Sequence, residues 1–135
     1  MRCIGLLGGM SYHSTVDYYT GINRAVAAAE GGHHSAPLLL SSLDFAAVRG
    51  FQQAGDWDAA GALLADHALR LERAGAEAVV ICTNLMHKVA PAVEAALTVP
   101  LLHIVDAVAA EARRLGLGSL GILGAAWTMT QPFYA

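Results

Sequence analysis

A thiol, a hydroxyl and an amide follow one another in the segment Cys82-Thr83-Asn84. They come at the end of an apolar run, residues 79–82, which has the length and the β-branched residues of a buried parallel strand. Open α/β folds bind their ligands where such strands end, at the carboxyl edge of the sheet. The segment therefore predicts a binding or catalytic site at that edge.

Each of these side chains also has a purely structural interpretation. A buried cysteine such as Cys82 often acts as a small apolar residue, although a thiol beside a helix start has a lowered pKa and becomes reactive. A lone threonine at position 83 is typical of a hydroxyl bonded to the backbone near a helix. His87 lies one helical turn after Thr83, where an imidazole orients a neighbour or relays a proton, but isolated histidines are more often structural.

The turn Gly8-Gly9 follows the first apolar segment of the chain. Its backbone N–H groups, at the start of a helix, either hold an anion or form only a tight turn. Together with Gly5 the two glycines do not make the G-x-G-x-x-G fingerprint, so no dinucleotide cofactor is expected. His33 and His34 have no third ligand at a metal-site spacing, so no metal is expected either.

Segments typical of strands and of helices alternate along the chain. Strands are predicted at residues 2–7, 38–41, 79–82, 101–104 and 120–123. Helices are predicted at residues 14–30, from a cap at Asp56 to Gly75, from a cap at Asn84 to Leu97, and at residues 105–115, whereas residues 45–54 carry no assignment. This alternation predicts an α/β fold, a parallel sheet with helices on both faces, connected by right-handed crossovers.

Composition narrows the class of protein. The chain has 135 residues, of which 56% are hydrophobic and 14% charged, so few charges remain to solvate the surface and an apolar interface is expected. A net charge of −3 without a basic cluster argues against nucleic-acid or anionic-membrane partners. No apolar run has the length of a membrane span, no signal peptide is evident, and Cys3 and Cys82 form no disulfide framework. We therefore expect a cytoplasmic protein.

The order of the motifs resembles the aspartate/glutamate racemase family, whose members are cofactor-independent amino acid racemases. The resemblance runs along the whole chain. The matching segments are Ile4-Gly5-Leu6-Leu7-Gly8-Gly9-Met10-Ser11, Tyr18-Tyr19, Ile22-Asn23, His34-Ser35-Ala36, Asp44-Phe45, Gly55-Asp56-Trp57, Ala74-Gly75-Ala76, Cys82-Thr83-Asn84, Met86-His87-Lys88, Pro100-Leu101-Leu102-His103-Ile104 and Thr128-Met129.

The resemblance implies two similar α/β domains that face each other across a cleft, with one catalytic group on each side. Residues 1–105 would form the first domain, and residues 106–135 a connecting helix and the first strand of an incomplete second domain. Family members are longer and carry an opposing cysteine in that second domain, so we expect this chain to be their amino-terminal portion. A small amino acid substrate, no cofactor and a homodimer are also implied.

Residue roles follow from the same resemblance. Family members with a thiol in the first motif read cysteine-asparagine-threonine, and alignment on Asn84 and His87 puts the place of that thiol at Thr83, with Cys82 behind it. The chain therefore resembles the branch with a threonine and cysteine pair, and Thr83 and Cys82 are its catalytic candidates.

The expected substrate contacts are Met10, Ser11, Asn84 and Thr128, with Arg49 binding the distal carboxylate of the substrate. Taken alone, Arg49 reads as a solvated surface cation. Donors on the α-carboxylate are expected from the amides around Asn84 and from the turn at Gly8-Gly9, which the strand pattern places on the same rim.

Three functions remain open at this stage. Inversion at Cα needs one group to remove a proton and another to return one on the opposite face, so the chain would act within a complete racemase. A stand-alone module that binds an amino acid or assembles with a partner, without turnover, fits the same motifs. A related isomerase or hydrolase of small acids would instead use Cys82 as a nucleophile.

Overall fold

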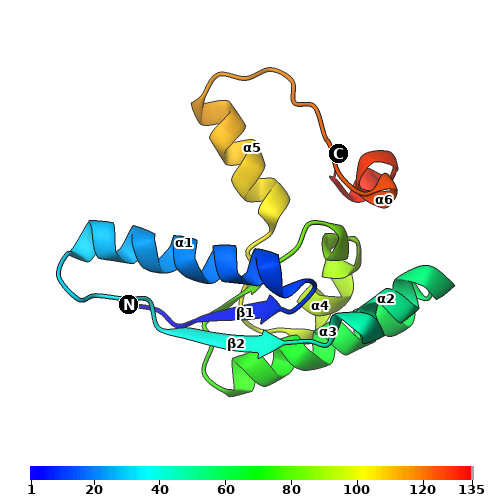
Figure 1. Ribbon diagram of the computed structural model, residues 1–135, viewed down its shortest axis with the longest axis horizontal. Helices are drawn as coiled ribbons and strands as arrows, with labels where there is room; N and C mark the ends of the chain where they lie inside the picture. The colour runs from blue at the N-terminus through cyan, green and yellow to red at the C-terminus, as the bar shows by residue number, and fades with distance from the viewer. Residues whose placement is uncertain (135) are drawn as a thin grey trace.

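The computed structural model describes residues 1–134, and its centre is a parallel sheet of three strands (Figure 1). Strand β1 (Ile4–Gly8) lies between β2 (Leu38–Ser42) and β3 (Ala78–Ile81). Leu7 of β1 is level with Ser41 of β2 and Ile81 of β3, so all three strands end at one edge. The parallel sheet predicted from the sequence is confirmed.

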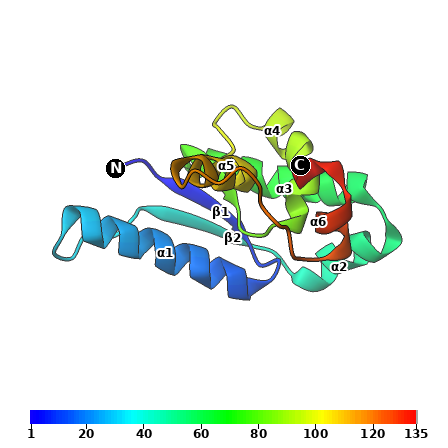
Figure 2. The same cartoon turned by 90° about the horizontal axis from the view of Figure 1, so that it is seen from above.

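Helices cover both faces of the sheet, as the alternation predicts (Figure 2). Helix α1 (Tyr12–Glu30) lies on one face and α3 (Trp57–Arg73) on the other. The side chain of Asp56 caps α3 by accepting a hydrogen bond from the Ala59 amide at 3.0 Å. One stripe of α3 faces the sheet and is buried, made by Ala60, Leu64, Ala68 and Leu71 at helical spacing.

Residues 45–54, which the sequence left without an assignment, form helix α2 (Phe45–Ala54). Asp44 caps it by accepting from the Ala46 amide at 3.0 Å, and Gly55, with a left-handed φ of 70°, ends it. Only Val48 and Gln52 of this helix are buried. Phe51 also packs against the core, so the helix carries a short inward stripe, and its capping residues gave a further signal.

The single helix predicted after Asn84 is divided in two. Residues Leu85–Val89 form a 3-10 helix, η1, and α4 follows at Ala90–Ala96. Pro91 lies in the first turn of α4 and has no N–H to continue a regular helix from the preceding turn. The Asn84 side chain makes no capping hydrogen bond, so the predicted cap is not formed.

The fourth predicted strand is reduced to one bridge. Leu101 pairs in parallel with Val79, and the Leu102 amide donates to the Val79 carbonyl at 2.8 Å. The chain then turns into α5 (Ile104–Arg114), because Nδ1 of His103 accepts from the Val105 amide at 3.2 Å and caps the helix. The cap at His103 starts α5 only two residues after Leu101, so the bridge is not extended into a strand.

The fifth predicted strand, residues 120–123, is not formed in the part of the chain that the structure describes. A strand needs a hydrogen-bonded neighbour, and residues 120–123 pair with none of the three strands of the described sheet, β2, β1 and β3. Residues 120–123 instead face α5 across an apolar groove. The short helices α6 (Ala126–Thr130) and η2 (Pro132–Tyr134) follow.

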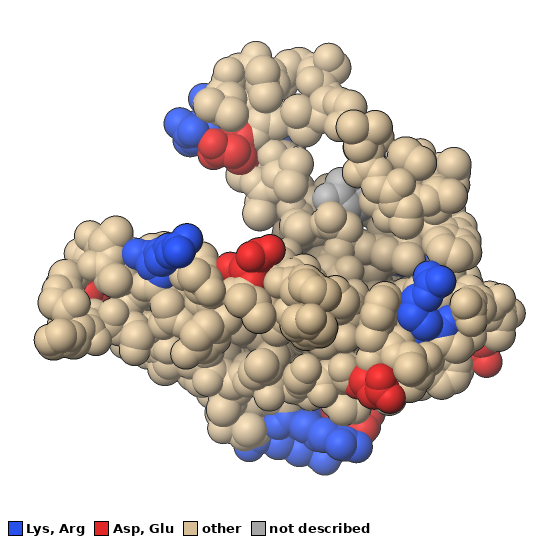
Figure 3. All heavy atoms as spheres, in the orientation of Figure 1, with Lys and Arg blue, Asp and Glu red and all other residues tan. Residues whose placement is uncertain are grey.

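Helix α5 projects away from the sheet, and α6 lies on the same side of the molecule, above the end that carries α2 (Figure 1). On the face drawn in Figure 3, charged side chains lie in small separate groups, and the basic ones form no continuous patch. Within residues 1–134, no helix is both long and apolar enough to cross a membrane.

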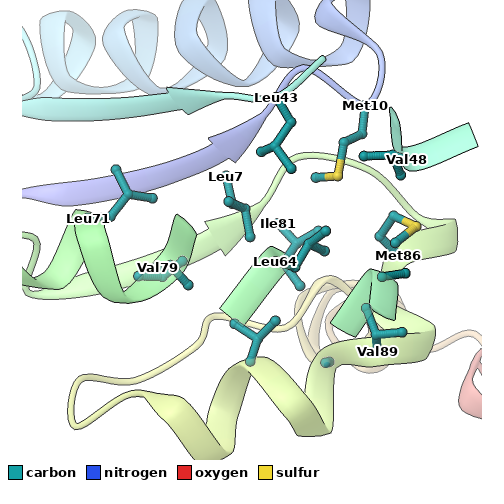
Figure 4. Packing of buried hydrophobic residues seen from close by; sticks show 14 of the residues in the cluster. Leu7, Met10, Leu43, Val48, Leu64, Leu71, Val79, Ile81, Met86 and Val89 are labelled. Atoms are coloured by element: carbon teal, nitrogen blue, oxygen red, sulfur yellow. The ribbon is translucent and has the colours of Figure 1, made fainter. Parts of the chain in front are cut away.

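The hydrophobic core lies between the sheet and the layer formed by α2, α3, η1 and α4 (Figure 4). Leu7, Val48, Leu64, Ile81 and Met86 are fully buried there. Burying a side chain of this size stabilises the fold by about 1.5–3 kcal/mol relative to exposure. The core therefore fixes the end of β3 and the start of η1, the two elements between which Cys82, Thr83 and Asn84 lie.

Candidate active site

A cavity of about 320 Å³ opens where β3 ends. It is lined by Ser14, Tyr18, Thr83, Asn84, Leu85, Ile104, Leu123, Gly124, Ala125 and Thr128. The walls thus come from α1, the turn after β3, the start of α5 and the segment that leads into α6. Figure 3 shows this face hollowed between α1 and α5, with mostly uncharged atoms around the hollow. The volume lies at the lower end of the range for small-molecule sites.

Three of the residues predicted from the sequence meet in this cavity, namely Thr83, Asn84 and Thr128. Thr128 is 5% exposed and reaches the cavity from α6, far along the chain from the other two. The predicted shared rim is also confirmed, because β1 and β3 end side by side and the Cys82 amide donates to the Leu7 carbonyl at 2.9 Å. The site therefore combines a hydroxyl, an amide and a second hydroxyl.

Cys82 belongs to the core rather than to the cavity. It has no exposed surface, and burial raises the pKa of its thiol from 9.0 to about 12. Such a thiol stays protonated at neutral pH, and a protonated thiol is a poor nucleophile and a poor base. The geometry therefore gives no support to the cysteine-dependent isomerase or hydrolase that the sequence left open.

Met10 and Ser11 lie on the same rim but are not among the described residues that line the cavity. Met10 is 4% exposed, and its side chain points into the core beside Leu43 and Val48 (Figure 4). The Ser11 carbonyl accepts a hydrogen bond from the Thr15 hydroxyl at 3.2 Å, within the first turn of α1. Both residues shape the start of α1, and their substrate contact stays a prediction.

The turn at Gly8-Gly9 is held closed by α1. The Gly9 amide donates to the Thr15 hydroxyl at 2.9 Å, so this N–H is already paired. Gly9 has a φ of 84°, and a Cβ there would lie 2.2 Å from the Leu43 carbonyl oxygen. Of the two interpretations of this turn, the tight turn fits the geometry better than the anion cradle.

Arg49 is exposed on α2 and is not among the described lining residues. Its role toward a distal carboxylate stays a prediction. No group of three or more His, Cys, Asp or Glu side chains within residues 1–134 is placed to hold a metal ion.

Two cavity residues, Ser14 and Tyr18, were missed by the sequence reasoning. They lie one turn apart on α1, the helix that follows the glycine turn. The Ser14 hydroxyl donates to the Cys82 carbonyl at 2.7 Å and so ties α1 to the end of β3. The sequence signal that could have indicated them is the pair of hydroxyls, four residues apart, on a helix that begins at the sheet edge.

His87 is the most constrained polar side chain near the site. It is 1% exposed; its Nδ1 lies 2.8 Å from the Thr83 carbonyl oxygen, and its Nε2 lies 3.3 Å from the Ile104 amide nitrogen. Burial, followed by the charge of His103, lowers the pKa of His87 from 6.5 to about 4. The imidazole is therefore neutral at pH 7, which argues against proton relay and leaves the orienting and the structural interpretations.

A group of contacts holds α6 against the sheet unit, the part of the chain up to His103 that contains β1, β2 and β3. Lys88 Nζ lies 4.9 Å from the centre of the Trp57 ring and also donates to the Gln131 side chain. Trp57 meets Trp127 of α6 edge to face, with 6.0 Å between the ring centres. These contacts keep Thr128 at the cavity wall.

The chain thus has a parallel α/β sheet with a polar cavity at its carboxyl edge, the place where proteins of this fold class bind their ligands. Residues 7–135 match the sequence profile of the Asp/Glu/Hydantoin racemase family, and the chain belongs to this family. The resemblance seen in the sequence is thereby confirmed.

Two solved structures are similar over 99% of this chain. A proposed Asp/Glu racemase from Yersinia pestis is 49% identical with a TM-score of 0.95. PH1733 from Pyrococcus horikoshii OT3, an aspartate racemase homologue, is 32% identical with a TM-score of 0.84. The chain spans 58% of the length of each.

Proposed function

We propose that this chain supplies one half of the active site of an amino acid racemase that acts on aspartate or glutamate. The observation that carries the proposal is the cavity at the end of β3, where Thr83 and Asn84 are exposed to a ligand in a chain of the racemase family. The proposed reaction is proton transfer at Cα without a cofactor.

Thr83 is the proposed acid/base on one face of Cα. Inversion requires a group on each face, one to remove the proton and one to return it. A threonine hydroxyl is a much weaker base than a thiolate, so the two directions of transfer should be unequal.

The carbanion formed at Cα lies beside a carboxylate and needs hydrogen-bond donors fixed on that carboxylate. The Asn84 amide and the hydroxyls of Tyr18 and Thr128 lie on the cavity wall and are donors of the required type. No charged side chain is among the described lining residues, so the donors in this half of the site are neutral.

The second acid/base is proposed to lie outside these 135 residues. The described cavity wall carries no cysteine, histidine or carboxylate, and the solved relatives are longer than this chain. We retain the proposed division at residue 105, with α5 as the connection to a second domain. A homodimer and a cytoplasmic location are proposed with it, the latter supported by two free cysteines.

The test is isotope exchange at Cα. The 135-residue chain is incubated with L- or D-aspartate and L- or D-glutamate in deuterated water, and NMR follows deuterium incorporation while chiral chromatography follows inversion. We expect incorporation into one enantiomer without inversion, because a single group removes and returns the proton on the same face. Absence of incorporation from every substrate would contradict the proposal.

A further inference from the structure

We propose that His87 is a positioning residue of this site: its imidazole holds the turn at Thr83 and Asn84 at a fixed distance from the start of α5. The inference rests on the proposed function, because the group that it positions is the Thr83 hydroxyl. Loss of His87 would then move that hydroxyl while the sheet stays folded.

The hydrogen bonds of the His87 ring determine which of its two nitrogens carries the proton. A carbonyl oxygen only accepts, so the 2.8 Å contact with the Thr83 carbonyl requires a proton on Nδ1 of His87. A backbone amide only donates, so the 3.3 Å contact with Ile104 requires a lone pair on Nε2. These two contacts together select the neutral tautomer that carries its proton on Nδ1.

The two hydrogen-bond partners of His87 belong to different walls of the cavity. Thr83 and Ile104 both line the cavity, one after β3 and the other at the first turn of α5. A single buried ring thus joins two walls of the cavity that are distant in sequence. The secondary contact of Nδ1 with the Asn84 carbonyl, at 3.3 Å, adds a second point on the same turn.

The His87 ring is itself held in place by a neighbouring ring. His103 packs edge to face against His87, with 4.4 Å between the ring centres, and Nδ1 of His103 caps α5 at Val105. The neighbouring side chain of Lys88 points to Trp57 and Gln131 instead. His87 is therefore fixed on one side by His103 and on both nitrogens by backbone.

Two substitutions separate the two hydrogen bonds. In His87→Asn the amide nitrogen takes the place of Nδ1, which keeps the donor to Thr83 and removes the acceptor for Ile104. In His87→Gln the amide oxygen takes the place of Nε2, which keeps the acceptor for Ile104 and removes the donor to Thr83. His87→Leu removes both bonds at a similar volume, and circular dichroism selects conditions in which all three variants are folded.

The readout is the rate of deuterium exchange at Cα of aspartate, with kcat and KM measured separately. We expect His87→Gln and His87→Leu to lower kcat about tenfold to a hundredfold with little change in KM, because the reacting group is displaced. His87→Asn should retain most of kcat. Equal losses in the Asn and Gln variants, or no loss in either, would overturn the inference, because a merely structural histidine does not distinguish its two nitrogens.

A second measurement does not depend on turnover. Nitrogen-15 shifts of the His87 ring should show a protonated Nδ1 and an unprotonated Nε2 at neutral pH, and the amide resonances of Thr83 and Asn84 should move more in His87→Gln than in His87→Asn. The opposite tautomer, or equal movement in the two variants, would overturn the positioning role. A wild-type chain with these NMR features and no exchange would contradict the proposed function alone.

Discussion

The sheet unit up to His103 and the segment from Ile104 onward differ in how their apolar residues are used. In the sheet unit, Leu64 and Ile81 are fully buried against other elements. Helix α5 is as clearly amphipathic as α3, with Ile104, Val105 and Val108 along one side, yet no residue of α5 is buried. The comparison teaches that an amphipathic pattern predicts a helix, while burial depends on the presence of a facing element.

The difference divides the proposed site between a rigid part and a less supported part. Thr83 and Asn84 follow a strand that is fixed by the core, whereas Thr128 depends on contacts of α6 with Trp57 and Lys88. Substitutions in the two regions should therefore have different consequences for stability and for binding.

The largest expected effect is a difference in stability between the core and the end of α5 when leucine is replaced by alanine in each. Leu64→Ala removes a fully buried side chain and should lower the free energy of unfolding by about 2–5 kcal/mol. Leu115, the C-cap residue of α5, is 54% exposed, so Leu115→Ala should change the free energy of unfolding by less than about 0.5 kcal/mol. Urea denaturation of both variants measures the contrast, and similar losses would show that α5 is packed in solution.

The next effect is the pH dependence that His87 adds to the sheet unit. Its pKa in the folded chain, about 4, lies below its ordinary value of 6.5, so protonation favours the unfolded chain. The stabilisation is complete above pH 6.5 and is lost as the pH falls toward 4, by about 3 kcal/mol in total. Urea denaturation across this range should show a steeper loss for the wild type than for His87→Asn. Parallel curves would mean that His87 titrates normally.

Arg49 tests which region holds the distal carboxylate of the substrate. If this cation binds it, Arg49→Ala should weaken the binding of aspartate and glutamate by about 1.5–3 kcal/mol and leave alanine unaffected. Calorimetry compares the three ligands, and Arg24→Ala, a loss of the same charge from α1, is the matched control. Equal losses for alanine and aspartate would exclude this role for Arg49.

The smallest expected effect concerns the attachment of α6. Trp127→Ala removes the edge-to-face contact with Trp57, which is worth about 0.5–1.5 kcal/mol beyond burial. We expect little change in global unfolding but faster hydrogen exchange in residues 126–130. Met129→Ala, at a residue of the same helix that is 49% exposed, serves as the control. Unchanged exchange in Trp127→Ala would show that other contacts hold α6.

The sequence predicted the sheet better than the segments around it. The three strands were placed correctly because each is a short apolar run bounded by glycine or polar residues. The strand predicted at residues 120–123 did not form because a strand needs a pairing partner, and no local pattern reports whether one lies beside it. Helix α2 was missed because the polar Gln52 interrupts its inward face of Val48 and Phe51, although the caps Asp44 and Gly55 could be read from the sequence.

The candidate site was predictable where it follows from strand ends. Thr83 and Asn84 follow a buried strand, so their place at the sheet edge could be read from the residues. The approach of Thr128 depends on tertiary packing and came only from the family resemblance. The burial of Cys82 and the two contacts of His87 also depend on distant elements, which explains why both residues had two interpretations at the sequence level.

The most direct test of the central claim compares two threonines in the same exchange assay. Thr83→Ala removes the cavity hydroxyl, while Thr98→Ala removes an exposed hydroxyl that bonds to Glu72 outside the cavity. We predict that Thr83→Ala lowers deuterium incorporation at Cα of aspartate by about a hundredfold or more and that Thr98→Ala leaves it unchanged. Incorporation at the wild-type rate in folded Thr83→Ala would contradict the account.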